Sequence, residues 1–63
     1  MISQKKQRKA EALLEDTFVG KHKRNLWKVT DIDGNILDRA NTKSMALYLA
    51  CKMEGKEEQI LAL

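Results

Sequence analysis

The chain has 63 residues, a formal net charge of +3, one cysteine, one histidine and no proline. This length suffices for a single small domain, residues 1–63, which is marginally stable without a disulfide, a metal or a partner subunit. A lone cysteine excludes an intramolecular disulfide, and one Cys with one His excludes a closed zinc site of four ligands. We therefore expect a homodimer to supply the missing support.

Membrane attachment and secretion are not expected. The sequence contains no run of about 18 apolar residues that could span a bilayer. No apolar segment follows the basic start, so we expect no secretory signal. Together with the unpaired cysteine, these features predict a cytoplasmic protein.

The charge is unevenly distributed along the chain. Residues 1–28 carry eight basic and three acidic side chains, a net charge of +5, whereas residues 29–63 carry four basic and six acidic ones, a net charge of −2. The positive field therefore belongs to the first half. Such an asymmetry indicates a polyanionic partner.

Residues 3–19 are predicted to form an amphipathic helix. Ser3 can cap its start and Gly20 can end it. Apolar or weakly polar side chains recur at helical spacing at Ala10, Leu13, Leu14, Thr17 and Phe18. The basic residues 1–9 precede this stripe and have nothing to bury. We expect them to project, to fray or to lie on a partner.

Residues 25–40 are predicted to form a two-stranded antiparallel hairpin. A two-residue turn at Asp33 and Gly34 would set Lys28 against Arg39, two like charges, and Val29 against Asp38. A turn with Gly34 in a left-handed bulge position shifts the pairing by one residue. This second register pairs Val29 with Leu37, Lys28 with Asp38, Thr30 with Ile36 and Trp27 with Arg39.

We predict the second register, because each of its pairs is favourable. Trp27, Val29 and Leu37 then share the buried face of the hairpin. The segment Asp31-Ile32-Asp33-Gly34-Asn35 also superficially resembles the start of a calcium loop. It lacks the glycine and glutamate that such a loop needs at its sixth and twelfth positions, so we interpret it as a turn.

Residues 43–54 are predicted to form a second helix, capped by Thr42 or Ser44 and ended by Gly55. No residue from 45 to 51 is charged, and a helix that is apolar nearly all round is buried on more than one side. One hairpin and one amphipathic helix cannot cover two sides of it, so we expect a second copy to contribute. Residues 56–63 are predicted to form a short terminal helix. The expected dimer or partner interface comprises Met45, Leu47, Tyr48, Cys51, Ile60, Leu61 and Leu63.

The inventory of catalytic side chains is nearly empty. His22 has no carboxylate beside it in sequence, and Cys51 lies in an apolar run that is typical of an inert buried thiol. No glycine-rich phosphate loop is present. We therefore expect no enzyme activity, no cofactor and no metal. The fold class that these elements predict is α+β, with a helix, a hairpin, a second helix and a short terminal helix.

The basic residues of the first half are the candidate binding site. If the first helix and the hairpin pack together, they can border one surface that follows phosphates. We predict nucleic-acid binding, with RNA favoured, because the sequence has no helix-turn-helix and no zinc finger. The competing interpretations are a solvated charged face and a surface for an acidic protein. The candidate residues are Lys5, Lys6, Arg8, Lys9, Lys21, Lys23, Arg24 and Lys28.

The chain resembles the small early proteins of T4-like phages. The resemblance lies in its size, its lysine-rich start and the stretch from Asp31-Ile32-Asp33-Gly34-Asn35 to Met45-Ala46-Leu47-Tyr48-Leu49-Ala50. It implies a decoy or inhibitor of host machinery in the host cytoplasm, such as a counter to a toxin ribonuclease. The implied partner is a host protein, an RNA or both. The alternative to RNA binding is therefore an antitoxin-like protein inhibitor that acts through its apolar helix and tail.

Overall fold

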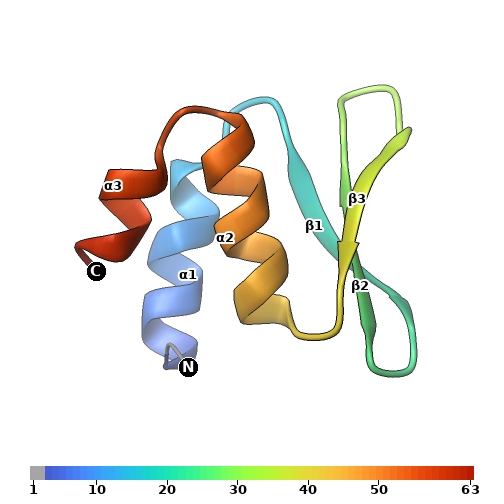
Figure 1. The fold of residues 1–63 in the computed structure, drawn as a ribbon, viewed down its shortest axis with the longest axis horizontal. Coiled ribbons are helices and arrows are strands. Elements are labelled where there is room, and N and C mark those ends of the chain that lie inside the picture. Colours follow the sequence, from blue (N-terminus) through green and yellow to red (C-terminus); the bar gives the residue numbers. More distant parts are fainter. Residues whose placement is uncertain (1–2) are drawn as a thin grey trace.

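The computed structural model describes residues 3–63. A helix is followed by three strands and two further helices (Figure 1), namely α1 Gln4–Leu13, β1 Phe18–Lys23, β2 Leu26–Thr30, β3 Ile36–Ala40, α2 Lys43–Met53 and α3 Glu57–Leu61. The strands form one antiparallel sheet in the order β1-β2-β3. The predicted α+β class is confirmed, but the predicted two-stranded sheet is wrong, because β1 adds a third strand.

The first helix is shorter than predicted. Ser3 caps it as expected, since its hydroxyl accepts a hydrogen bond from the Lys6 backbone N–H at 3.2 Å. The helix ends at Leu13 rather than near Val19. The segment that follows enters β1, where aromatic and β-branched residues favour a strand. The predicted helix-ending role of Gly20 is therefore wrong, because this glycine lies inside β1.

The turn between β2 and β3 has the predicted left-handed glycine, but the register is wrong. Gly34 has φ +85° and donates to the Asp31 carbonyl at 3.1 Å. The register shifts again beyond the turn, where Leu37 is an extra residue in β3. Because of this bulge at Leu37, Ala40 lies opposite Trp27 and faces the core. In the predicted register, the charged Arg39 would have been opposite Trp27 instead. The observed pairs are Trp27 with Ala40, Lys28 with Arg39, Val29 with Asp38 and, as predicted, Thr30 with Ile36.

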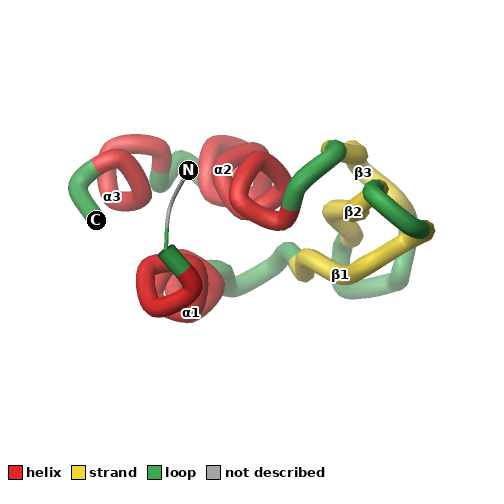
Figure 2. The backbone as a smooth tube through the Cα atoms, turned by 90° about the horizontal axis from the view of Figure 1, so that it is seen from below, coloured by secondary structure: helices red, strands yellow, loops and turns green. Residues whose placement is uncertain are grey.

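Helix α2 is the centre of the molecule and is covered on two sides. Thr42 caps it and Gly55, with φ +73°, follows its end, as predicted. On one side Ala46 and Ala50 pack against the sheet, on the other Leu47 and Cys51 pack against α1 and α3. Figure 2 shows all three helices on the same side of the sheet. A single chain thus buries both sides of α2, which we had expected to require a second copy.

Several apolar side chains lie outside this core. Leu37 is 47% exposed, so its predicted place on the buried face of the hairpin is wrong. In α2, Met45, which was predicted to lie in an interface, and Met53 are also about half exposed. In the terminal helix, Ile60 is buried while Leu61 is exposed. The short helix α3 is therefore held to the core by one face, through Ile60 and, three residues later, the half-buried Leu63.

Candidate nucleic-acid interface

Three segments that are distant in sequence lie at one end of the fold. At the lower end of Figure 1 the start of α1 and the turn between β1 and β2 are on opposite sides, with the start of α2 between them, and Figure 2 views this end directly. Seven of the eight predicted basic residues lie in two of these segments. We call this set the basic end: Lys5, Lys6, Arg8 and Lys9 in the first half of α1, and Lys21, Lys23 and Arg24 at the β1–β2 turn.

The basic end is open to solvent and unneutralised. All seven of its side chains are exposed. Among residues 3–63, ion pairs involve only Lys43 and Lys56 as the cations. The folded chain thus leaves the seven charges without an acidic partner. A ligand with several negative charges could bind these cations without breaking an ion pair among residues 3–63.

The start of α2 adds a cation that is already paired. Lys43, its first residue, lies 3.8 Å from the Glu11 carboxylate and 5.7 Å from the centre of the Trp27 ring. Both contacts hold this ammonium group between α1 and the sheet. Lys43 therefore acts mainly as a structural clamp beside the basic end. Next to it, the Gln7 amide of α1 donates to the Ser44 hydroxyl at 3.0 Å, which fixes the basic half of α1 against α2.

The acidic residues collect at the opposite end. Seven of the nine lie in the α1–β1 loop, the β2–β3 turn, the end of α2 and the start of α3, and the first three of these segments lie together at the upper end of Figure 1. The protein therefore has a charge dipole that runs from the lower to the upper end of Figure 1, across its longest axis. The sequence predicted a difference between the two halves of the chain, whereas the fold converts it into a difference between two ends. These seven acids are Glu15, Asp16, Asp31, Asp33, Glu54, Glu57 and Glu58.

One of these acids, Glu54, is a structural lock rather than a free charge. Its carboxylate accepts the backbone N–H groups of Glu15, Asp16 and Thr17 at 2.9 to 3.3 Å and the Thr17 hydroxyl. Lys56 lies 3.3 Å away and reaches the Leu13 carbonyl as well. Burial would raise the pKa of Glu54, but these hydrogen bonds outweigh it and lower the pKa to about 2. The lock explains why α1 stops, because three N–H groups point to Glu54 instead of continuing the helix.

The predicted apolar interface is divided by the fold. Met45 and Leu61 are exposed, with 52% and 67% of their surface open to solvent, and are available to a partner. Tyr48 and Leu63 are half-buried against the core, and the Tyr48 hydroxyl hydrogen-bonds to Glu57. Three other residues of the predicted set are buried inside the chain, namely Leu47, Cys51 and Ile60.

Cys51 is placed as its apolar surroundings indicated. It is fully buried, and its sulfur faces the Ala10 carbonyl at 3.9 Å. Burial, reinforced by the nearby Glu54 carboxylate, raises the pKa of the thiol. The thiolate that nucleophilic chemistry requires is therefore disfavoured at neutral pH.

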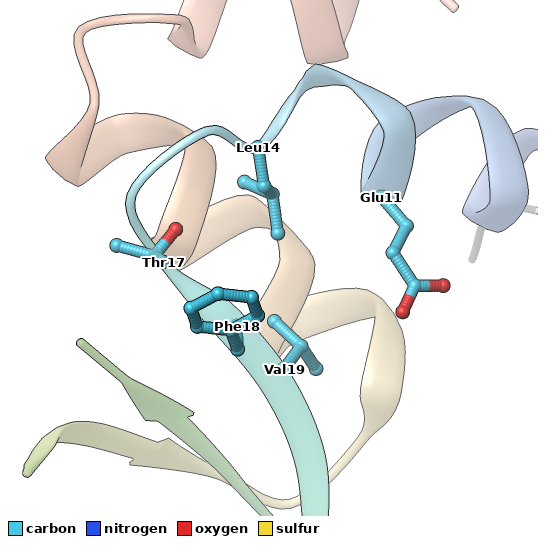
Figure 3. Close-up of a pocket in the computed structure, with 5 residues that line it drawn as sticks. All are labelled: Glu11, Leu14, Thr17, Phe18 and Val19. Atoms are coloured by element: carbon cyan, nitrogen blue, oxygen red, sulfur yellow. The ribbon is translucent and has the colours of Figure 1, made fainter. Parts of the chain in front are cut away.

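A small hollow of about 160 Å³ lies between α1 and the edge of β1 (Figure 3). Its lining contains one carboxylate, Glu11, and otherwise the side chains of Leu14, Thr17, Phe18 and Val19. A single acid, itself paired with Lys43, offers no acid–base couple. Within residues 3–63 no cluster of three or more His, Cys, Asp or Glu side chains could hold a metal ion.

Phe18 and Arg39 were missed as surface candidates. From the sequence, Phe18 was predicted to lie on the buried stripe of a helix. The run Thr-Phe-Val favours a strand, however, and in the structure β1 begins at Phe18. The turn that returns the chain into β2 contains Asn25, which has a positive φ. Arg39 was paired with Trp27 by the wrong register. Lys28, the eighth predicted residue, is half-buried in the middle of β2 and lies opposite Arg39.

Comparison with known proteins assigns no family. No protein-family model matches the chain. No curated protein and no solved structure matches it significantly. None of the helices in residues 3–63 is long and apolar enough to cross a bilayer.

Proposed function

We propose that this protein binds RNA through its basic end. The observation that carries the proposal is the position of seven exposed cations at one end of the fold, four from α1 and three at the β1–β2 turn, none of them in an ion pair within the described residues. Lys and Arg side chains that neutralise phosphates release condensed counterions, which supplies most of the affinity in such complexes. The acidic end points away from the ligand, so the dipole also orients the protein during approach.

Recognition by the basic end rests on the backbone of the nucleic acid. The cations come from a helix start and a turn, and neither segment presents a set of side chains arranged to read base edges. This mode favours RNA, whose duplex hides its base edges in a deep and narrow major groove. A small RNA-binding protein of this kind could counter a host toxin ribonuclease, which fits the role of a decoy or inhibitor of host machinery implied by its resemblance to early phage proteins.

A homodimer remains part of the proposal and would double the number of basic ends per particle. Fewer apolar residues support a homodimer than the sequence indicated, because the fold buries two sides of α2 within one chain. The apolar groups that a second copy would cover are Met45 and Leu61. Sedimentation of the parent and of a Leu61→Ser variant tests this directly, since the parent should show twice the chain mass and the variant should not.

The proposed function is tested by a salt series with matched variants. Replacing the four cations of α1 by Gln should weaken binding of a labelled RNA and reduce the slope of log affinity against log salt by about three. Replacing the three cations of the β1–β2 turn should have a similar, slightly smaller effect. Lys52→Gln is the control, because Lys52 is an exposed cation of α2 outside the basic end.

The outcomes separate RNA binding from its main alternative. A parent protein that does not bind RNA at low salt, or a variant without the four α1 cations that binds as tightly as the parent, would refute the proposal. Binding to a protein that barely responds to salt would instead support an inhibitor acting through apolar residues. The four substitutions touch no buried residue, so the folded state should persist in each case.

A further inference from the structure

One face of the sheet is left uncovered by the rest of the chain. All three helices lie on the other face, as Figures 1 and 2 show from two directions. Val19, Val29, Trp27 and Ala40 belong to the core that faces α2. Because side chains alternate along a strand, their neighbours point to the open face.

The open face consists of two adjacent rows across the three strands. The first row is uncharged and mainly apolar, with one threonine on β2, and the second is basic with a glycine on β1. A Cβ built on Gly20 would lie 3.9 Å from the Lys28 side chain, which confirms that Lys28 extends over this glycine. No acidic residue occupies either row. The rows are Phe18, Thr30 and Ile36, then Gly20, Lys28 and Arg39.

The basic row carries an unfavourable contact that the chain does not relieve. Lys28 and Arg39 are directly opposite each other, and like charges in this position destabilise a sheet. Neither side chain forms an ion pair within the described residues. An anion between the two cations would turn this repulsion into attraction. The pair is therefore suited to a phosphate group.

The apolar row exposes an aromatic ring beside this pair. Phe18, the only phenylalanine in the chain, is 53% exposed. Phe18 on β1 is the diagonal neighbour of Lys28 on β2, because Thr30 lies opposite Phe18 and Lys28 lies opposite Gly20. Diagonal neighbours on one face of a sheet are about 7–8 Å apart. A base can thus stack on Phe18 while its phosphate reaches Lys28 and, opposite it on β3, Arg39.

We propose that the open face binds single-stranded RNA, with a base on Phe18 and a phosphate between Lys28 and Arg39. The proposal rests on the proposed function and specifies the form of RNA that is bound. Charge complementarity favours this occupant over a second copy of the chain. A symmetric dimer through this face would bring two Lys28–Arg39 pairs together with no acid in either row to neutralise them.

Fluorescence anisotropy with a labelled oligouridylate and with a labelled RNA duplex tests the proposal. Phe18→Leu retains apolar bulk but removes the stacking surface, and should weaken oligouridylate binding about tenfold. Phe18→Tyr retains the ring and should bind like the parent. Both variants should bind the duplex like the parent, because paired bases are not available to stack.

The basic row is tested by a pair of charge variants. Arg39→Gln should lower oligouridylate affinity several-fold, whereas Lys52→Gln, on α2, should not. Without RNA, Arg39→Gln should leave the urea midpoint unchanged or raise it, because the repulsion with Lys28 is removed. A purely structural role of Arg39 would lower the midpoint instead.

The failure of this inference is distinguishable from the failure of the proposed function. If Phe18→Leu and Arg39→Gln bind oligouridylate within twofold of the parent, while removal of the α1 cations abolishes binding, the open face is not a binding surface. If the parent binds neither RNA, both proposals fall. If the parent is a dimer with and without RNA and the Phe18→Leu variant is a monomer, the open face binds a second copy of the chain instead of RNA.

Discussion

Removal of the Glu54 carboxylate is expected to weaken the fold more than any other single change at the acidic end. Only 7% of this side chain is exposed, and it gathers the backbone of the α1–β1 loop together with Lys56. A pKa lowered from 4.5 to about 2 is equivalent to roughly 3 kcal/mol of stabilisation at neutral pH at most. Because Glu15 and Asp16, two of the loop residues that Glu54 binds, are exposed, solvent screening reduces this to about 1–2 kcal/mol. A domain of this size has a total stability of about 3–9 kcal/mol.

The assay is urea unfolding of the Glu54→Gln variant, followed by the fluorescence of the single tryptophan, Trp27. With a slope of about 1 kcal/mol per M for a small domain, the midpoint should fall by about 1–2 M at pH 7. Glu58→Gln is the matched control, because it removes an exposed carboxylate of α3 that makes no side-chain hydrogen bond within residues 3–63. Its midpoint should change by a few tenths of a molar at most.

The pH dependence supplies a second criterion. The folded-state pKa of Glu54 lies below the unfolded value, so its stabilisation is fully present above about pH 4.5 and is lost as the pH falls toward 2. The difference in unfolding free energy between the parent and Glu54→Gln should therefore shrink across this window. A difference that stays constant from pH 6 to pH 2, or a variant as stable as the parent at pH 7, would refute the role of the lock.

Three further substitutions or reactions test the local structure. Gly34→Val should lower the free energy of unfolding by about 1–3 kcal/mol, because Gly34 has φ +85°, although a new side chain there would meet no neighbour. Gly20→Ala should leave the free energy of unfolding nearly unchanged, and equal urea midpoints for the two variants would contradict this reasoning. Thr42→Ala should lower the free energy of unfolding by about 1 kcal/mol, since the Thr42 hydroxyl accepts a hydrogen bond from the Met45 N–H of α2. A variant as stable as the parent in thermal or urea unfolding would show that Thr42 is not a cap. The Cys51 thiol should react with a disulfide reagent at least about 100-fold more slowly in the folded protein than in urea, and rapid native labelling would show that α2 opens easily.

The elements that were predictable from sequence are those specified by adjacent residues. Helix α2 was located by its uncharged run, by Thr42 at its start and by Gly55 after its end. The left-handed turn at Gly34 follows from local chemistry in the same way, because only glycine adopts this conformation without cost. Each of these signals lies within a few residues of the structure that it specifies.

The parts that were not predictable depend on contacts between distant residues. The end of α1 is set by Glu54, which lies 37 to 39 positions from the N–H groups that it binds. Local periodicity alone extended the helix through Phe18 and so hid β1. The β2–β3 register likewise depends on Ala40 fitting beneath α2, which outweighs the repulsion between Lys28 and Arg39. Pair preferences between strands could not reveal this, because the deciding contact is with a helix.

The candidate site also depends on both local sequence and distant contacts. The basic residues could be found by composition, but only the fold brings the α1 start and the β1–β2 turn to one end and the acids to the other. The residues that stabilise the acidic end, Glu54 and Lys56, are buried or paired. The cations of the basic end take part in no ion pair within the described residues and lie outside the core. Stability and binding therefore reside at opposite ends, so the basic end should tolerate charge substitutions that change RNA affinity without unfolding the protein.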